Sequence, residues 1–191
     1  MKQKNSKHNY IYRNFLLALK DIKKLKTYFI FSLTIFLLFT IIGLVFPTFF
    51  TEKILELIKD LINQTRGLST LELISFITSN NIQVAFFGMI FGILLGILPF
   101  LALVVNGYVL GFVANQAIAI DGIFVLWRLL PHGIFEIPAI LISTALGIRL
   151  GTDLKNIKKN FISSIRIFLL IVIPLLVIAG LIEGLFIGLA S

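Results

Sequence analysis

Long apolar stretches limit what this chain can fold into. The first, residues 27–47, is 21 residues long and carries no charge, close to the roughly 20 residues that a helix needs to cross a bilayer core. Similar apolar runs occupy residues 82–120, 134–148 and 167–182, and only Glu136 places a charge within them. Charged residues make up 14% of the chain, whereas soluble domains average about 25%. The sequence therefore predicts an integral membrane protein and excludes a soluble enzyme.

The positions of the basic residues indicate how the chain crosses the membrane. Eight of the seventeen lysines and arginines precede the first apolar run, and five more lie in or beside residues 151–164. Lysine and arginine accumulate on the cytoplasmic side of membrane proteins, so both clusters are expected inside the cell. Acidic and basic residues nearly balance in residues 48–81, which suits an outer loop.

Five spans place both basic clusters on one side, whereas four or six would not. We therefore predict a single-domain, all-α bundle in the cell membrane, with its N-terminus in the cytoplasm and its C-terminus outside. A basic segment at 1–26 precedes the spans and an outer loop occupies 48–81; the spans cover about 27–47, 82–100, 103–120, 131–150 and 165–189. A re-entrant segment at Asn106 and Gly107 is the alternative to a continuous third span.

Two segments outside the spans have the periodicity of amphipathic helices. In residues 8–26, apolar residues recur at helical spacing among basic ones, which is typical of a helix on an anionic leaflet; an ordinary charged juxtamembrane segment is the alternative. In the outer loop, residues 54–62 form one apolar helical face, and Ser69 with Glu72 forms a capping-box pattern that predicts a second short helix. These faces are expected to contact the membrane, the bundle or a partner protein.

Glycines at every fourth position predict where helices pack closely. This spacing places small residues on one helix face and lets a second backbone approach. The pattern occurs in the second and fifth spans and comprises Gly88, Gly92, Gly96, Gly180, Gly184 and Gly188. We expect these faces to join helices within one chain. The alternative is a seam between two copies, which would make the protein a homo-oligomer.

Ionisable residues within spans cost about 2.5–3.5 kcal/mol each to insert, so they indicate a specific role. His132 and Glu136 are four residues apart and hence one helical turn apart. Glu183 and Arg128 lie at a similar predicted depth, and the four residues form a predicted polar cluster in the outer half of the membrane. Three roles fit this cluster: a structural lock between helices, a site for a ligand, proton or ion, and intramembrane catalysis.

The catalytic role has the least support. The two-histidine spacing of metalloproteases and the Gly-x-Ser-x-Gly nucleophile turn are absent from the sequence. His132 and Glu136 supply too few ligands to predict a metal ion, and the absence of cysteine excludes thiol catalysis. We therefore expect no enzymatic activity and no cofactor. Nucleic acid is not an expected partner either, because the net charge of +8 flanks the spans instead of forming a binding fold.

Three motifs resemble those of a known membrane-protein family. Residues 130–139, which read LPHGIFEIPA, resemble a motif of the stage II sporulation protein M family, and residues 106–111 and 147–151 resemble two further elements. The resemblance covers roughly residues 83–191 and implies a polytopic membrane fold without assigned catalytic residues. The positions that match the family motifs are Asn106, Gly107, His132, Gly133, Glu136 and Pro138.

The resemblance also implies a function, because the named member of that family is a scaffold that assembles cell-wall hydrolases. We therefore expect a non-enzymatic scaffold that contacts the lipid bilayer and organises membrane or extracytoplasmic protein partners. The alternative is a small transporter or a transporter-associated subunit that uses His132, Glu136 and Glu183 for a substrate or proton. Interrupted stretches near Asn106 and residues 131–138 are of the kind that line transporter sites. A water-filled cavity at Glu136 would favour transport, and a close-packed interior would favour the scaffold.

Overall fold

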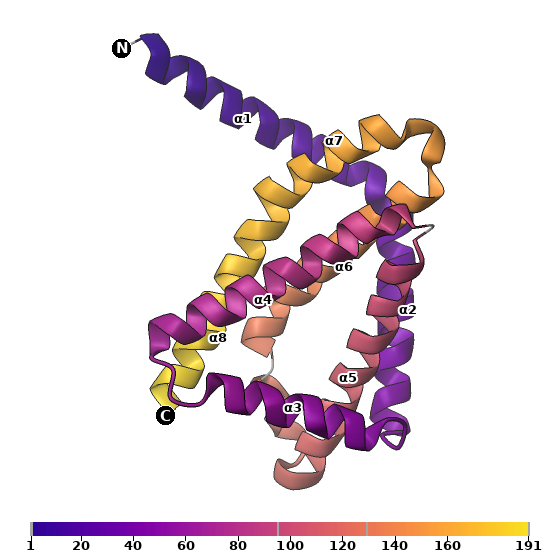
Figure 1. The fold of residues 1–191 in the computed structure, drawn as a ribbon, viewed down its shortest axis with the longest axis vertical. Helices are drawn as coiled ribbons and strands as arrows, with labels where there is room; N and C mark the ends of the chain where they lie inside the picture. The colour runs from indigo at the N-terminus through magenta and orange to yellow at the C-terminus, as the bar shows by residue number, and fades with distance from the viewer. Residues whose placement is uncertain (1, 95, 129, 191) are drawn as a thin grey trace.

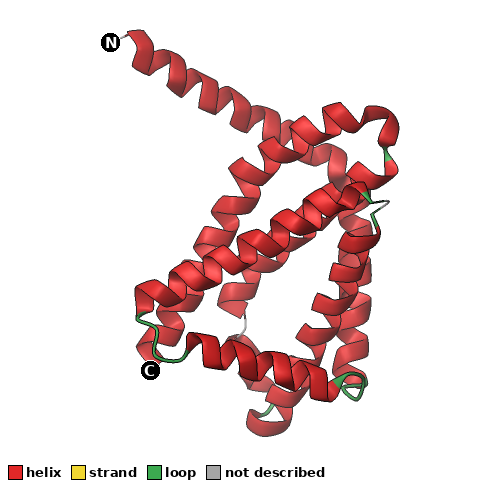
Figure 2. Ribbon diagram, viewed as in Figure 1, coloured by secondary structure: helices red, strands yellow, loops and turns green. Residues whose placement is uncertain are grey.

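The computed structural model describes residues 2–94, 96–128 and 130–190, without the side chains of residues 2–9, 127, 128, 130–132, 189 and 190. Within these ranges every regular element is helical (Figure 2). The longer helices are α1 (Lys2–Ile22), α2 (Lys26–Val45), α3 (Thr51–Thr65), α4 (Thr70–Ile90), α5 (Ile97–Asp121), α6 (Leu130–Thr152), α7 (Ile157–Ile167) and α8 (Ile173–Ala190). Short 3₁₀ segments are η1 (Lys23–Leu25), η2 (Phe91–Ile93), η3 (Ile123–Arg128) and η4 (Leu154–Asn156), and the π-helical η5 (Phe168–Val172) joins α7 to α8.

Five helical segments are long and apolar enough to cross a membrane, which confirms the predicted fold class. They are Tyr10–Val45, Thr70–Ile93, Ile97–Asp121, Gly133–Thr152 and Leu154–Gly188. The third of them contains α5, which continues as one helix through Asn106 and Gly107. The alternative of a re-entrant segment at these two residues is therefore wrong.

The second long helix begins earlier than its hydropathy indicates. α4 runs from Thr70 to Ile90, so it starts well before the predicted span at 82–100 and ends inside it, and α5 begins within the same range at Ile97. The predicted capping box opens it: the Glu72 N–H donates to the Ser69 hydroxyl, and the Ser69 N–H donates to the Glu72 carboxylate at 2.8 Å. The short helix and the second span that the sequence suggested as separate elements are therefore one helix.

α2 and α5 lie side by side as a parallel pair (Figure 1). Gly107 of α5 faces the Phe36 carbonyl of α2, and Gly111, one turn further on, faces the Thr40 carbonyl. Residue numbers rise together along both helices, which identifies the pair as parallel. A Cβ atom at Gly107 would lie 2.6 Å from the Phe36 oxygen. Only the missing side chain permits this approach of two backbones.

α4 and α8 form a second close pair, which is antiparallel. A side chain added to any of the three glycines of α8 would collide with a residue of α4. The facing pairs are Gly180 with Thr78, Gly184 with Ile74, and Gly188 with Thr70. Residue numbers fall on α4 as they rise on α8. This glycine face is therefore covered by a helix of the same chain.

The glycines of the second span all face α6, but they do not lie on one continuous helix, contrary to the prediction from their spacing. Gly92 lies in η2, beyond the end of α4, where it faces the backbone of Gly147 in α6. Gly96 has a φ of 71° and directly precedes α5. That left-handed conformation is readily adopted by glycine and rarely by other residues. Gly92 and Gly96 thus form the tight turn between α4 and α5.

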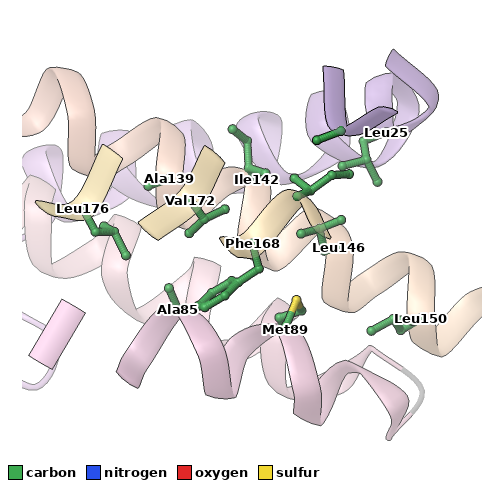
Figure 3. Close-up of a cluster of buried hydrophobic side chains, with 12 residues drawn as sticks. Leu25, Ala85, Met89, Ala139, Ile142, Leu146, Leu150, Phe168, Val172 and Leu176 are labelled. Atoms are coloured by element: carbon green, nitrogen blue, oxygen red, sulfur yellow. The ribbon is translucent and has the colours of Figure 1, made fainter. Parts of the chain in front are cut away.

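α6 occupies the centre of the bundle. It contacts α2, α4, α5 and α8, and residues 141–151 are all buried. Leu146 of α6 packs in one apolar cluster with Met89 of α4 and Phe168 of η5 (Figure 3). The Ser143 hydroxyl donates to the Ala85 carbonyl of α4, and Gly147 faces the Gly88 carbonyl one turn further on. α4 and α6 are therefore parallel.

The helix directions alternate as five consecutive crossings require: α2, α5 and α8 run one way, and α4 and α6 run the other. Two ends of the bundle follow from this (Figure 1). The basic end holds α1 and α7, and the α3 end holds α3 and the C-terminus. At the basic end, Arg166 Nη1 of α7 donates to Asp21 Oδ2 of α1 at 3.2 Å. Both clusters of basic residues in the sequence therefore lie at one end.

This arrangement allows a direct test of membrane topology. The chain has no cysteine, so a cysteine placed at exposed Lys158 or at exposed Lys59 supplies a single thiol. We expect Lys158→Cys to react with a membrane-impermeant maleimide only from the cytoplasmic side and Lys59→Cys only from the outside. Reaction of both from one side would contradict the five-span topology. Reaction from opposite but exchanged sides would contradict the predicted orientation.

Candidate functional site

The predicted polar cluster lies near the start of α6, towards the α3 end. Glu136 is half-buried in the second turn of α6, and its Oε2 atom is inaccessible to solvent. Glu183 is half-buried on α8. Arg128 and His132 belong to η3 and α6, but their side chains lie outside the described residues. The structure therefore describes two of the four predicted side chains.

Helix register places the two carboxylates at similar depths. Because α4 and α6 are parallel in the register set by the Ser143 hydrogen bond, Glu136 is level with Thr78 of α4. Thr78 faces Gly180 of α8, which precedes Glu183 by less than one helical turn. α6 and α8 also pack against each other. Glu136 and Glu183 thus stand on neighbouring helices within about one helical turn of the same level.

Pro138 and Gly133 are the other two motif residues of α6, and only Pro138 alters the hydrogen bonds of the helix backbone. Pro138 stands inside the helix, which continues past it to Thr152. Proline has no N–H, so the carbonyl one turn earlier, on Ile134, loses its helical partner. Among the described residues, the nearest atom to a Cβ added at Gly133 is Ile137 Cδ1 of the same helix, at 3.4 Å. Gly133 therefore does not mark a close approach of a second described helix.

The motif at residues 106–111 holds α5 against α2 and the segment that follows it. The Tyr108 hydroxyl donates to the Phe46 carbonyl and accepts from the Phe49 N–H, both at 2.9 Å. Asn106 Nδ2 donates to the Ala102 carbonyl one turn earlier in α5, at 2.8 Å. With the close contact at Gly107, these interactions give the motif a structural role at the end of α2.

Comparison with known proteins assigns the family. The family described as Stage II sporulation protein M matches residues 29–186, a range that contains all three motifs. The chain belongs to the stage II sporulation protein M family. It is 30% identical over 144 residues to an uncharacterized protein of Methanocaldococcus jannaschii, in a match that covers 70% of this chain. The chain spans 62% of the length of that curated relative. No solved structure matches the chain.

The structure of this family member also reveals a buried cation, which the sequence analysis counted only among the basic residues in or beside residues 151–164. Arg149 lies near the C-terminal end of α6, at the basic end, and is 5% exposed. Its Nη2 atom donates to the Asn160 carbonyl at 3.2 Å and to the Ser164 hydroxyl at 3.4 Å. Both acceptors are uncharged. One signal was visible in the sequence, because Arg149 interrupts the apolar run at residues 145–150.

Arg149 lines a cavity of about 600 Å³ between the end of α1, the end of α6 and the start of α7. We call this cavity the basic pocket. Its lining includes one acidic residue, Asp21, and six basic ones: Lys24, Arg149, Lys155, Lys158, Lys159 and Arg166. Nearby, the side-chain amides of Asn160 and Asn156 donate hydrogen bonds to the Asp153 carboxylate at 2.8 and 3.0 Å. These hydrogen bonds lower the pKa of the Asp153 carboxyl group below its ordinary value.

Proposed function

We propose that this protein is a non-enzymatic membrane scaffold that organises partner proteins through the α3 end of its bundle. The proposal rests chiefly on one observation, the uncovered apolar surface of α3. Ile54 of α3 is 4% exposed and packs against Tyr108 and Phe112 of α5, which fixes the helix to the bundle. Ile58 is half-buried against the same cluster, whereas four other apolar residues of the helix, Leu55, Leu57, Leu61 and Ile62, are 47–59% exposed. We call these four residues the α3 patch.

The charges on α3 support a protein partner in preference to an anionic lipid surface. Lysines at positions 53 and 59 oppose the acidic residues Glu52, Glu56 and Asp60, so α3 carries a net charge of about −1. Helices that lie on a bilayer are typically rich in lysine and arginine on their polar face. α1 matches that description, with five basic residues against one acidic residue. An exposed apolar patch on a helix of balanced charge is typical of a protein interface.

The centre of the bundle supports the scaffold over the transporter. Residues 141–148 of α6 are buried on every side, and Gly147 meets the backbone around Gly88 and Gly92 directly. A helix that lines a water-filled pathway keeps one face accessible. This half of α6 instead has the complete burial that a packing helix needs.

A double substitution within the α3 patch tests the proposal. We expect Leu57→Ser with Leu61→Ser to abolish co-purification of a cross-linked protein partner from native membranes. The melting temperature should stay within about 2 °C of wild type, because both side chains are exposed. The matched control is Leu94→Ser with Leu98→Ser, which changes one exposed leucine of the turn between α4 and α5 and one in the first turn of α5.

The readout is the set of proteins recovered after cross-linking through a photoreactive residue at position 55. A partner that is recovered with wild type and the control, and lost from the double variant, would support the scaffold. Recovery of lipid alone, or equal recovery of the partner from all three proteins, would contradict it.

A further inference from the structure

Arg149 is a buried cation without a counter-ion in the described part of the chain. It is 5% exposed, and its Nε atom is inaccessible and has no hydrogen-bond partner among the described residues. The two bonds from its Nη2 atom go to neutral oxygens at 3.2 and 3.4 Å, which are long for a charge-assisted hydrogen bond. Burying a charge is costly unless it is paired. The fold therefore keeps a cation where an anion would be strongly stabilising.

Neither nearby carboxylate neutralises Arg149 through an ion pair. Asp21 binds Lys24 at 2.6 Å through Oδ1 and Arg166 at 3.2 Å through Oδ2. Asp153 accepts hydrogen bonds from Asn156 and Asn160. Both carboxylates attract Arg149 across the intervening space, but neither forms a hydrogen bond or an ion pair with it.

The basic pocket surrounds Arg149 with further positively charged residues. Six basic residues and one acidic residue line a cavity of about 600 Å³, which is within the range of roughly 300–1,000 Å³ for small-ligand sites. Lys158 and Lys159 are exposed at its rim, so their long side chains are free to reach an occupant. Cations held this close repel one another, and a bound anion would replace that repulsion with attraction.

The position of the pocket indicates the class of anion. It lies where α6 ends and the loop to α7 begins, at the level of the lipid headgroups if α6 spans the bilayer. Pockets of basic residues at the ends of membrane helices bind phospholipid headgroups, and arginine matches phosphate oxygens with two parallel N–H donors. We propose that the basic pocket binds a phosphate group, with Arg149 as its buried ligand and Lys158 as a ligand at the rim. An anionic phospholipid and free inorganic phosphate are the two sources of that group.

Thermal unfolding of the full-length protein in nanodiscs tests the site and separates the two sources. One sample contains phosphatidylcholine alone, a second adds an equal amount of phosphatidylglycerol, and a third adds inorganic phosphate to phosphatidylcholine. We expect phosphatidylglycerol to raise the melting temperature of wild type by about 5 °C. Arg149→Gln should lose this rise, and Lys158→Gln should lose about half of it. Lys20→Gln is the matched control, since it removes one charge at the basic end outside the pocket.

Each result of this unfolding experiment either supports or overturns the proposed phosphate site. A rise with phosphatidylglycerol that depends on Arg149 supports a lipid phosphate, and a rise with inorganic phosphate that depends on Arg149 supports a soluble one. If Arg149→Gln does not fold, a smaller rise in Lys158→Gln than in Lys20→Gln supports the site. The proposal is overturned if no sample raises the melting temperature of wild type. Equal rises in the pocket variants and in Lys20→Gln would overturn it as well, because they indicate a general attraction of basic protein to anionic lipid.

Discussion

Replacing Gly92 with leucine should destabilise the bundle by about 3 kcal/mol, the upper end of the usual cost of overpacking. A Cβ at this position would overlap the backbone of Gly147 in α6, and backbone atoms cannot rotate away as a flexible side chain can. Gly184→Leu should have a similar effect, because its Cβ would overlap Ile74 Cγ1 and lie 3.0 Å from the Ile74 Cα atom of α4. The measurement is the free energy of unfolding in detergent.

Two exposed leucines beside these glycines provide the controls. Leu94 is 58% exposed and Leu185 is 48% exposed, so Leu94→Ala and Leu185→Ala should change the free energy of unfolding by about 0.5 kcal/mol or less. If both glycine variants unfold at the same free energy as these controls, the contacts at Gly92 and Gly184 do not set the packing of α4, α6 and α8.

Apolar runs and charge placement were enough to predict the helical class and the five long helices. Hydropathy depends only on composition within a window, so it locates long apolar helices but cannot see the apolar turn between α4 and α5, which lies inside the predicted span at 82–100. The parallel pair of α2 with α5 and the antiparallel pair of α4 with α8 match the alternation that the basic clusters required. Glycine spacing also indicated which face of α8 packs closely, since Gly180, Gly184 and Gly188 each face α4.

The start of α4 could not be predicted from hydropathy, because its first turns are polar for a tertiary reason. Residues 75–81 include two serines, a threonine and two asparagines, a composition that is typical of a loop. In the structure Thr70 and Thr78 lie against glycines of α8, so hydroxyl-bearing side chains serve as contacts between helices. The capping box at Ser69 and Glu72 was the local signal of the true start.

The basic pocket was missed for a related reason. The rule that places basic residues in the cytoplasm treats Arg149 like its neighbours Lys155, Lys158 and Lys159. It assigns a side of the membrane and carries no information about burial. Arg149 differs because it lies on α6 before the helix ends and points between helices, which only the packing of α7 against α6 determines.

Glu136→Ala should destabilise the protein by about 3 kcal/mol, as expected when one member of a buried polar group is removed and its neighbours are left in place. Glu136 is half-buried with Oε2 inaccessible, and it stands level with Thr78 and near the depth of Glu183. Glu136→Gln keeps the volume and one carbonyl oxygen as an acceptor, so its cost should be about 1 kcal/mol or less. Thermal unfolding of both variants in phosphatidylcholine nanodiscs provides the measurement.

Comparison of the two Glu136 variants distinguishes a structural lock from a proton or ion site in the predicted polar cluster. In a structural lock, stability depends on hydrogen bonds that glutamine largely retains, so Glu136→Gln should resemble wild type both in stability and in recovery of the scaffold's partner. In a proton or ion site, the charge itself is required, and Glu136→Gln would keep its stability but lose function. Equal stability of Glu136→Ala and wild type would rule out the lock, because a buried carboxylate that holds helices together cannot be removed without cost.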